Sequence, residues 1–213
     1  MTSLADPVRG PSGTAPMPPP WLATTALPID VVPAGTTIFR VHRLGRDAIF
    51  FGPGRGEAPT YRFDSLTGGF GVLYVGFSLA AAVAETLLRN PSRRMVSYLD
   101  LAERAACHLI SARDLRVVRL HGTGLQTVGC DNAISTGPYD ACGAWADALW
   151  AHPDRPDGIA NQSRHDSSEI CLALFERSDL RLHAADSVPL TKQLPTTAAM
   201  LSAYGKSIVD API

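Results

Sequence analysis

Lysine is scarce in this chain of 213 residues and occurs only at Lys192 and Lys206. The chain also has no run of Lys and Arg that could follow a phosphate backbone, and 20 acidic residues nearly balance 19 basic ones. Direct binding of nucleic acid is therefore not expected. Nearly all of the positive charge is arginine, which binds phosphate through planar bidentate contacts better than lysine does. A GC-rich genome would produce the same share of arginine, so this share alone does not indicate a phosphate-containing ligand.

Motifs for metal, redox and membrane chemistry are missing as well. The four cysteines form no CxxC pair, and the six histidines show no HExxH or similar ligand spacing. We therefore expect no metal site and no redox pair, and we interpret the cysteines as free thiols. No segment is long and apolar enough to span a bilayer, and the N-terminus lacks the pattern of a signal peptide. The sequence thus predicts a soluble, cytoplasmic protein that does not bind a membrane.

The composition changes once along the chain. Residues 1–28 are rich in Pro, Gly, Ser, Thr and Ala, which predicts a flexible arm, with Trp21 and Leu22 as candidates for docking onto the body. The remainder, residues 29–213, is expected to fold as one domain. Its apolar content is ordinary for a folded core, since 46% of the whole chain is hydrophobic.

Short strands mixed with a few helices are expected along this body. Composition and alternation favour strands at 37–42, 71–76, 95–101, 116–120, 169–176 and 180–183, with a further candidate at 107–110. Helical spacing favours helices at 79–89, 139–151 and 189–204, the first capped by Ser78. No internal repeat or long series of βαβ units is present. The predicted fold class is α+β, a single domain of mixed short strands with surrounding helices.

Two segments resemble known motifs only superficially. The Gly-rich stretch 51–57 lacks the Gly-Lys-Ser/Thr ending of a phosphate loop, and no helix pattern follows it, so we predict an exposed loop. Ser163, His165 and Asp166 have the residue types of a hydrolase triad, but they lie too close together on one extended segment for its geometry. A serine hydrolase is therefore not expected.

Glu85 is an unusual residue because it lies within Ala80–Leu88, the most apolar helix that the sequence predicts. One explanation is that this helix face reaches solvent. The other is a functional carboxylate with a raised pKa, or one that faces a positively charged reacting centre. Cleavage of an N-glycosidic bond passes through an oxocarbenium-like state, which a nearby carboxylate stabilises. The residue type therefore fits a glycosidic cleavage but does not prove it.

Arg40, Arg62 and Tyr74 are the residues that would complete such a site. Both arginines lie on or beside predicted strands and could fix a pyrophosphate through bidentate contacts, and the Tyr74 ring could stack on a base or on nicotinamide. Taken singly, each arginine is equally well explained by a surface salt bridge and Tyr74 by a core phenol. Their combination with Glu85 favours the functional reading.

The same residues lie in a series of segments that resembles the RES-domain family, bacterial toxins of toxin–antitoxin modules named for an Arg, a Glu and a Ser. The resemblance extends from about Thr37 to Val209 and depends on the order and spacing of the segments. These are Ile38-Phe-Arg-Val41, Arg62-Phe-Asp64, Gly71-Val-Leu-Tyr74, Ala84-Glu85, Tyr139-Asp-Ala-Cys-Gly-Ala-Trp145-Ala, Asp157-Gly-Ile-Ala-Asn-Gln-Ser-Arg-His-Asp166 and Cys171-Leu-Ala-Leu-Phe175.

The resemblance implies a fold similar to that of ADP-ribosyltransferase toxins and a set of site residues. Many members place the family's Arg directly after a Gly-Gly pair, but here Phe70 follows Gly68 and Gly69. We therefore assign that role to an arginine that precedes the turn. The implied catalytic residues are Arg62, Glu85 and Ser163, and the implied substrate-binding residues are Arg40, Tyr74 and Arg164.

The activity implied by the resemblance is consumption of NAD⁺ as a substrate, by hydrolysis or by phosphorolysis with inorganic phosphate as co-substrate, without a prosthetic group. In this hypothesis Arg62 and Arg40 clamp the diphosphate, Tyr74 packs on nicotinamide, and Glu85 stabilises the ribosyl cation. Ser163 would hydrogen-bond a phosphate or a ribose hydroxyl. Transfer of ADP-ribose to a protein remains an alternative, and so does a non-catalytic module that binds a nucleotide or a partner. The implied partner is a cognate antitoxin with a DNA-binding domain.

Overall fold

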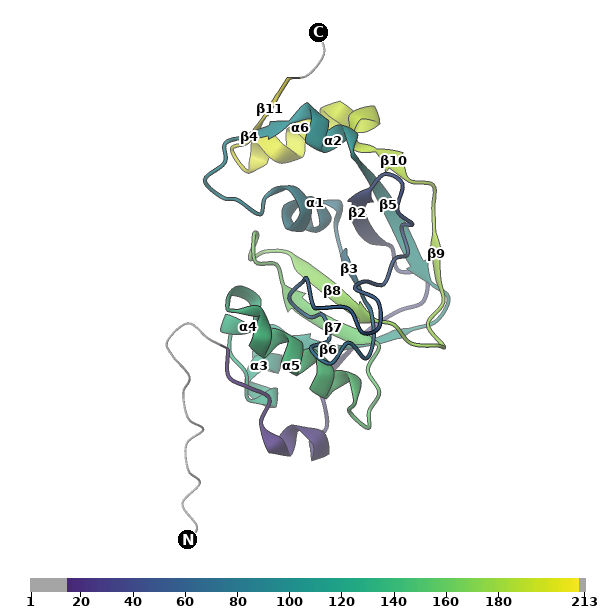
Figure 1. The fold of residues 1–213 in the computed structure, drawn as a ribbon, viewed down its shortest axis with the longest axis vertical. Helices are drawn as coiled ribbons and strands as arrows, with labels where there is room; N and C mark the ends of the chain where they lie inside the picture. Colours follow the sequence, from purple (N-terminus) through teal and green to yellow (C-terminus); the bar gives the residue numbers. More distant parts are fainter. Residues whose placement is uncertain (1–14, 211–213) are drawn as a thin grey trace.

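Short apolar segments pair into a nine-stranded mixed sheet in the computed structural model, which describes residues 15–210 (Figure 1). The strand order is β1-β6-β7-β8-β3-β2-β5-β10, and β9 also pairs with β5. Every pairing is antiparallel except the one between β6 and β7. The strands are β1 (Ile29–Val32), β2 (Ile38–Arg43), β3 (Val72–Gly76), β5 (Arg104–Ser111), β6 (Leu115–Leu120), β7 (Gly158–Gln162), β8 (Ile170–Phe175), β9 (Leu182–Ala184) and β10 (Val188–Pro189).

The sheet is weakly joined at its middle. β2 and β3 share a single residue pair, Phe39 with Gly76. By contrast, β2 pairs with β5 over six residues, and β3 pairs with β8 over five. The sheet therefore consists of two halves, one built on β2 and β5 and the other on β3, β8, β7, β6 and β1.

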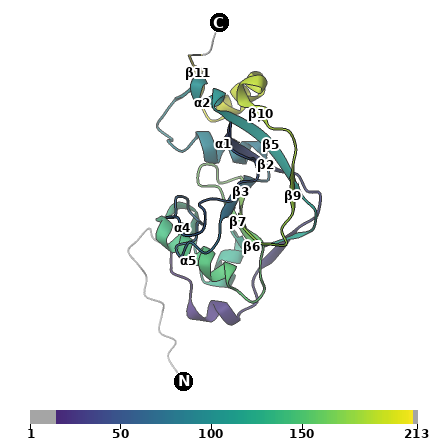
Figure 2. The same ribbon diagram turned by 45° about the vertical axis from the view of Figure 1, so that its right-hand side comes forward.

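Each half has its own helices, as two views of the ribbon agree (Figures 1 and 2). We call the half with β3, β8, β7, β6 and β1 the lower half. It packs against η1 (Pro20–Thr24), α3 (Thr123–Val128), α4 (Ala133–Thr136) and α5 (Tyr139–Trp150), with Trp145 fully buried among them. The half built on β2 and β5, which we call the upper half, packs against α1 (Leu79–Leu87), α2 (Tyr98–Ala102), η2 (Leu190–Gln193) and α6 (Leu194–Ala203). A separate two-stranded parallel sheet joins β4 (Met95–Ser97) to β11 (Ser207–Val209).

The predicted α+β fold class is confirmed, and so are most of the predicted elements. Ser78 caps α1 as expected, because its hydroxyl accepts the N–H of Ala81 at 2.9 Å. The predicted strand at 95–101 is wrong beyond Ser97, whose side chain accepts the N–H of Leu99 and so starts α2. The predicted helix at 189–204 is interrupted, with the 3-10 turn η2 preceding α6. The Gly-rich stretch 51–57 forms turns that are mostly exposed, as predicted.

Several elements were missed, of which β7 matters most for the site. Its sequence, Gly-Ile-Ala-Asn-Gln, has little of the β-branched and aromatic character of strands. Tertiary packing selects these residues, since a Cβ added to Gly158 would lie only 2.4 Å from the carbonyl oxygen of Ala173 on β8. The other elements without a sequence prediction are the strands β1, β10 and β11 and the helices η1, α3 and α4.

The prediction of a flexible arm is corrected for residues 15–28, while residues 1–14 lie outside the described part. Ala15, Leu22 and Leu27 are buried in the lower core. The indole N–H of Trp145 donates to the Pro16 carbonyl at 2.7 Å. A few apolar side chains therefore suffice to dock a segment whose average composition is that of a linker.

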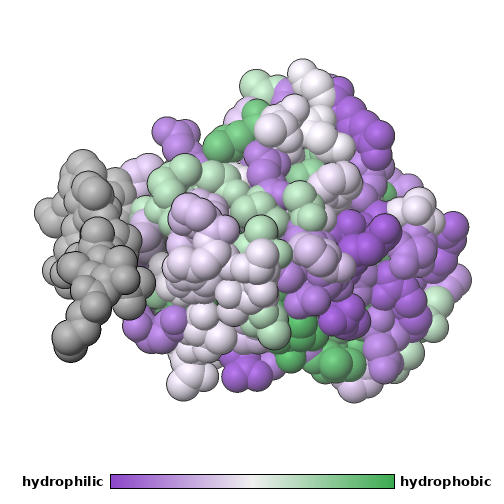
Figure 3. All heavy atoms as spheres, turned by 90° about the horizontal axis from the view of Figure 1, so that it is seen from below, coloured by the Kyte–Doolittle hydropathy of each residue, from purple (hydrophilic) through white to green (hydrophobic). Residues whose placement is uncertain are grey.

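The lower end of the molecule, which η1 forms, is shown from below in Figure 3. Pale, weakly polar or weakly apolar residues cover much of one side of this face, and strongly hydrophilic residues cover the other. Within residues 15–210, no helix is long and apolar enough to cross a membrane.

Replacement of Leu22 by alanine tests whether the segment before β1 belongs to the core. Leu22 is only 2% exposed, so we expect Leu22→Ala to lower the free energy of unfolding by about 2–5 kcal/mol in urea titrations. Met17 in the same segment is 61% exposed, and Met17→Ala serves as the matched control. Equal, small effects of both variants would show that the segment is not part of the core.

Candidate active site

A cavity of about 660 Å³ opens where the two halves of the sheet meet. It is lined by β2, β3, α1, the segment 61–63, the start of α5 and the loop that follows β7. Both halves of the molecule therefore contribute to it.

The lining of this cavity is strongly cationic. Glu85 is the only carboxylate among the lining residues, which include seven arginines. Those arginines are Arg40, Arg43, Arg46, Arg62, Arg89, Arg104 and Arg164. So many guanidinium groups around one cavity favour an anionic ligand, and phosphate groups match their planar donors well.

Glu85 lies half-buried on α1, with its carboxylate held from the opposite half of the molecule. The Ser163 hydroxyl donates to its Oε1 at 2.6 Å, and the backbone N–H of Arg164 donates to the same atom at 3.0 Å. Ser163 is 3% exposed, and its oxygen accepts the N–H groups of His165 and Asp166, each at 3.2 Å. These bonds fix the carboxylate in one orientation at the wall of the cavity.

The contacts of Ser163 give it a different task from the one that the sequence suggested. We expected this hydroxyl to bind a phosphate or a ribose hydroxyl, but its single proton is committed to Glu85. Ser163 Oγ accepts the backbone N–H of His165 rather than bonding to its imidazole, so Ser163 and His165 do not have the geometry of a hydrolase triad. Ser163 thus orients the carboxylate.

Arg62 lines the cavity from the lower half. Its Nη1 donates to the carbonyls of Ile134 at 3.3 Å and Gly137 at 2.9 Å. The guanidinium also lies over the ring of Tyr139, 5.0 Å from its centroid. The hydrogen bonds of Arg62 within residues 15–210 all use Nη1, so Nη2 and Nε have no acceptor among these residues.

A buried carboxylate holds the turn that presents Arg62. Asp64 is completely buried, and its Oδ2 accepts the N–H groups of Thr60 at 2.8 Å and Tyr61 at 2.6 Å. Burial raises the pKa of this carboxyl, although its hydrogen bonds oppose the shift. Asp64 therefore shapes the 60–64 turn and the direction in which Arg62 leaves it.

Tyr74 completes this turn through its hydroxyl. Its hydroxyl donates to Asp64 Oδ1 at 2.8 Å and accepts the N–H of Phe63 at 2.9 Å. Burial, together with the neighbouring Asp64, raises the pKa of Tyr74 well above its usual value. Its ring still lines the cavity, with the ring of Tyr61 packed edge-on at 5.6 Å.

Two exposed aromatic rings at the cavity were missed by the sequence analysis. Tyr61 and Tyr139 are 38% and 45% exposed, and both line the cavity. Tyr139 is exposed because it stands at the first residue of α5. A signal existed for Tyr61, since it directly precedes Arg62. These rings are better placed than Tyr74 to stack on a base.

Arg40 and Arg164 both line the cavity, as the sequence predicted for a common site. Arg40 projects from β2, and its Nη1 donates to the carbonyls of Ala48 at 2.5 Å and Phe50 at 3.3 Å. Burial lowers the pKa of Arg40 to about 10, so its guanidinium is still protonated at neutral pH. Arg164 is exposed and follows Ser163 on the loop after β7.

His165 is a further lining residue that the sequence analysis considered only as part of a triad. Burial lowers its pKa, while the nearby Glu85 carboxylate opposes that shift. A histidine with a lowered pKa is neutral at pH 7, so its ring adds no positive charge to the seven arginines.

The cysteines are all free, as the sequence indicated, and all four are buried. Burial raises the pKa of Cys130 and Cys171 to about 12, so both are protonated thiols at neutral pH. In the part of the chain that the structure covers, residues 15–210, no three His, Cys, Asp or Glu side chains gather in a way that could hold a metal ion.

Comparisons with known proteins identify a family and a similar fold. The model of the RES domain matches residues 37–195. A protein described as "Probable toxin y4kH" from Sinorhizobium fredii (strain NBRC 101917 / NGR234) is 37% identical over 65 residues. That match covers 30% of this chain and 50% of the relative, so the chain spans about half the length of the curated relative that it matches.

Among solved structures, the fold is similar to one in the "Crystal structure of the M.tuberculosis MbcT-MbcA toxin-antitoxin complex". The TM-score is 0.54 at 18% sequence identity, and the alignment covers 79% of this chain and 92% of the other. At this identity the likeness shows a shared fold.

Removal of the Tyr74 hydroxyl tests whether it supports the turn before Arg62. Tyr74→Phe leaves Asp64 Oδ1 and the Phe63 N–H without their partner, so the free energy of unfolding should fall by about 1–3 kcal/mol. Tyr139→Phe removes a hydroxyl that makes no hydrogen bond within the described residues, and it should leave stability unchanged. If urea titrations gave equal values for both variants, the supporting role would be disproved.

Proposed function

Because the chain belongs to the RES-domain family, we propose that it is the toxin of a toxin–antitoxin pair and that it cleaves the nicotinamide–ribose bond of NAD⁺. The observation that carries this proposal is a single oriented carboxylate, Glu85, in a cavity that seven arginines line. NAD⁺ matches both features, because it combines an anionic diphosphate with a positively charged nicotinamide ribose. The relatives named above are themselves described as a toxin and a toxin–antitoxin complex.

Binding of the dinucleotide is assigned to the arginines and the exposed tyrosines. Arg62 and Arg40 reach the cavity from opposite halves of the molecule and clamp the diphosphate between them. Arg164 adds positive charge beside Glu85. The rings of Tyr61 and Tyr139 provide flat surfaces on which a base or nicotinamide stacks.

Bond cleavage is assigned to Glu85. As nicotinamide leaves, the ribose develops positive charge, and the fixed carboxylate stabilises that charge more strongly in the transition state than in the ground state. Nicotinamide is a good leaving group and needs no general acid, which agrees with a cavity that presents one carboxylate. Ser163 and the Arg164 N–H keep this carboxylate in position.

The acceptor of the ADP-ribosyl group is water or inorganic phosphate, and the cell would lose its NAD⁺ in either case. Transfer to a protein would use the same residues. Incubation of the purified protein with NAD⁺, with and without phosphate, followed by product analysis, separates these outcomes. The partner that we assign is an antitoxin with a DNA-binding domain that blocks the cavity.

Glu85→Gln tests the catalytic carboxylate with little change of shape. The amide keeps an oxygen that accepts from Ser163 and Arg164 but loses the negative charge, so nicotinamide release should slow by at least about 100-fold. Glu103→Gln alters an exposed carboxylate outside the cavity and should keep full activity. Comparable activity of Glu85→Gln and the wild type would refute the assigned role.

Arg62→Gln tests the diphosphate clamp. Loss of a charged bidentate contact weakens substrate and transition state alike, so KM for NAD⁺ should rise by about tenfold or more while kcat changes little. Arg181→Gln, on an exposed arginine outside the cavity, is the control. A fall in kcat at constant KM would assign Arg62 to the chemical step instead.

A further inference from the structure

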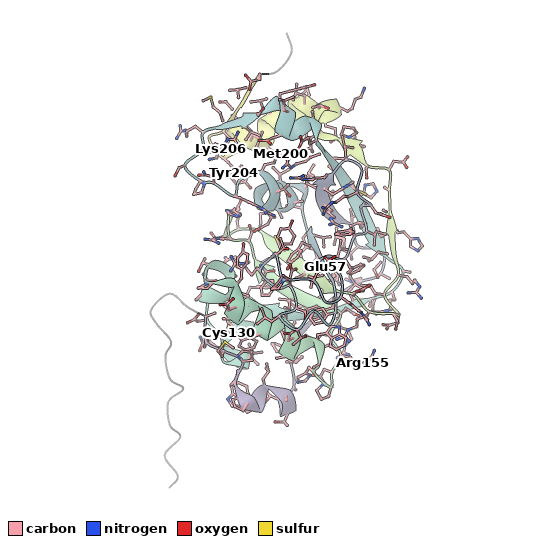
Figure 4. All side chains as sticks on the ribbon, viewed as in Figure 1. Glu57, Cys130, Arg155, Met200, Tyr204 and Lys206 are labelled. Carbon is pink, nitrogen blue, oxygen red and sulfur yellow. The ribbon has the colours of Figure 1, made fainter. Side chains whose placement is uncertain are left out.

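We propose that the C-terminal residues 204–209, which lie beyond the family match at 37–195, position Glu85 and Ser163 for the reaction by clamping the two loops that flank them. We call these residues the C-terminal clamp. The inference deepens the proposed function and rests on it for its kinetic consequences, whereas the contacts themselves are independent of any activity. Figure 4 labels Tyr204 and Lys206 just below α6, on the side that faces α1.

The first contact of the clamp is with the loop that follows α1. Lys206 is one of only two lysines and is 8% exposed. Its ammonium donates to the carbonyls of Asn90 at 3.5 Å and Pro91 at 2.8 Å, and also to that of Arg93. A buried ammonium that meets three carbonyls fixes the direction of the chain that leaves α1, and with it the last turn of the helix, where Glu85 lies.

Strand pairing extends this first contact. The N–H of Ser207 donates to the Arg94 carbonyl at 3.0 Å, and β11 then runs parallel to β4 from the pair Ser207–Met95 to the pair Val209–Ser97. The segment 90–97 is therefore held along its length by residues 206–209.

The second contact of the clamp is with the loop between β7 and β8, which carries Ser163. The Tyr204 hydroxyl donates to Asp166 Oδ2 at 2.6 Å. The other carboxylate oxygen of Asp166 accepts from the N–H of Ser168 at 2.9 Å and from its hydroxyl at 2.6 Å. One tyrosine thereby fixes a carboxylate that organises the tip of this loop.

These two contacts meet at the site. The loop carries the Ser163 hydroxyl and the Arg164 N–H to Glu85 Oε1, and the Asp166 N–H bonds back to Ser163 Oγ. Glu85 and Ser163 come from opposite halves of the molecule, whose strands are joined by a single residue pair. The clamp thus adds a connection between the two halves close to the reacting carboxylate, and Tyr204 and Lys206 are positioning residues rather than catalytic ones.

Tyr204→Phe tests the clamp with the smallest possible change, the loss of one hydroxyl. We expect kcat for nicotinamide release to fall about tenfold with KM for NAD⁺ unchanged. The charge-assisted bond to Asp166 is lost, which loosens the loop whose Ser163 and Arg164 orient Glu85, while the arginines stay in place. Tyr98→Phe, on α2 near the same end of the molecule, removes a hydroxyl that makes no hydrogen bond within residues 15–210 and should behave as the wild type.

Hydrogen exchange on the same full-length proteins provides a readout that needs no activity. In Tyr204→Phe the amide protons of Arg164, His165 and Asp166 should exchange faster, since their acceptors lie at Glu85 and Ser163, while the amides of β8 keep their protection. Wild-type kcat together with unchanged exchange at these three amides would overturn the proposal. A fall in kcat without faster exchange there would overturn it as well.

Two substitutions of Lys206 test the first contact of the clamp, one that removes the positive charge and one that keeps it. Lys206→Met should lower kcat and speed exchange at the same amides, and Lys206→Arg should restore part of both, whereas Lys192→Met, at an exposed lysine on η2, should have no effect. If Lys206→Met does not fold, Tyr204→Phe alone decides. If the wild type releases no nicotinamide from NAD⁺, the proposed function fails, and the exchange data still decide whether the clamp exists.

Discussion

The hydrogen bond from Ser163 to Glu85 is the contact on which the site depends. It joins α1, which belongs to the upper half of the molecule, to the loop after β7, which belongs to the lower half. The sheet itself joins these halves through one residue pair between β2 and β3. The weak junction leaves room for a cavity, and the hydrogen bond fixes the relative position of the groups on its two sides. A loop and the end of a helix therefore hold together the two sides of a site that the strands alone do not connect.

The positive charge of the cavity destabilises the empty protein, and binding of an anionic ligand would offset this loss of stability. Seven arginines around one carboxylate repel one another when the cavity holds no anion, and burial already lowers the pKa of Arg40 to about 10. Carbonyl acceptors compensate part of this cost, at Ala48 and Phe50 for Arg40 and at Ile134 and Gly137 for Arg62. An anionic dinucleotide would relieve the repulsion, so the same electrostatics that destabilises the empty cavity favours binding.

The sequence predicted which residues converge better than it predicted what each one does. Glu85 was identified because a carboxylate is out of place in an apolar helix, and the predicted site residues Arg40, Arg62, Tyr74 and Arg164 do line one cavity. Ser163 does not line it, and its bond to Glu85 spans 78 positions, so no local pattern could reveal its partner. The commitment of Tyr74 to Asp64 was hidden for a related reason, since Asp64 looks like an ordinary turn residue until its burial is known. β7 was missed, and residues 15–28 were predicted as a flexible arm with only Trp21 and Leu22 as docking candidates, because tertiary packing overrides composition in both segments.

The proposed function depends on which bond of NAD⁺ the protein breaks. A time course recorded by proton and phosphorus NMR on NAD⁺ with the wild-type protein follows nicotinamide and the diphosphate in one sample. We predict that free nicotinamide appears while the phosphorus signals of the diphosphate persist, because Glu85 acts at the ribose and the arginines only hold the phosphates. Cleavage of the diphosphate, or NAD⁺ that stays intact, would contradict it.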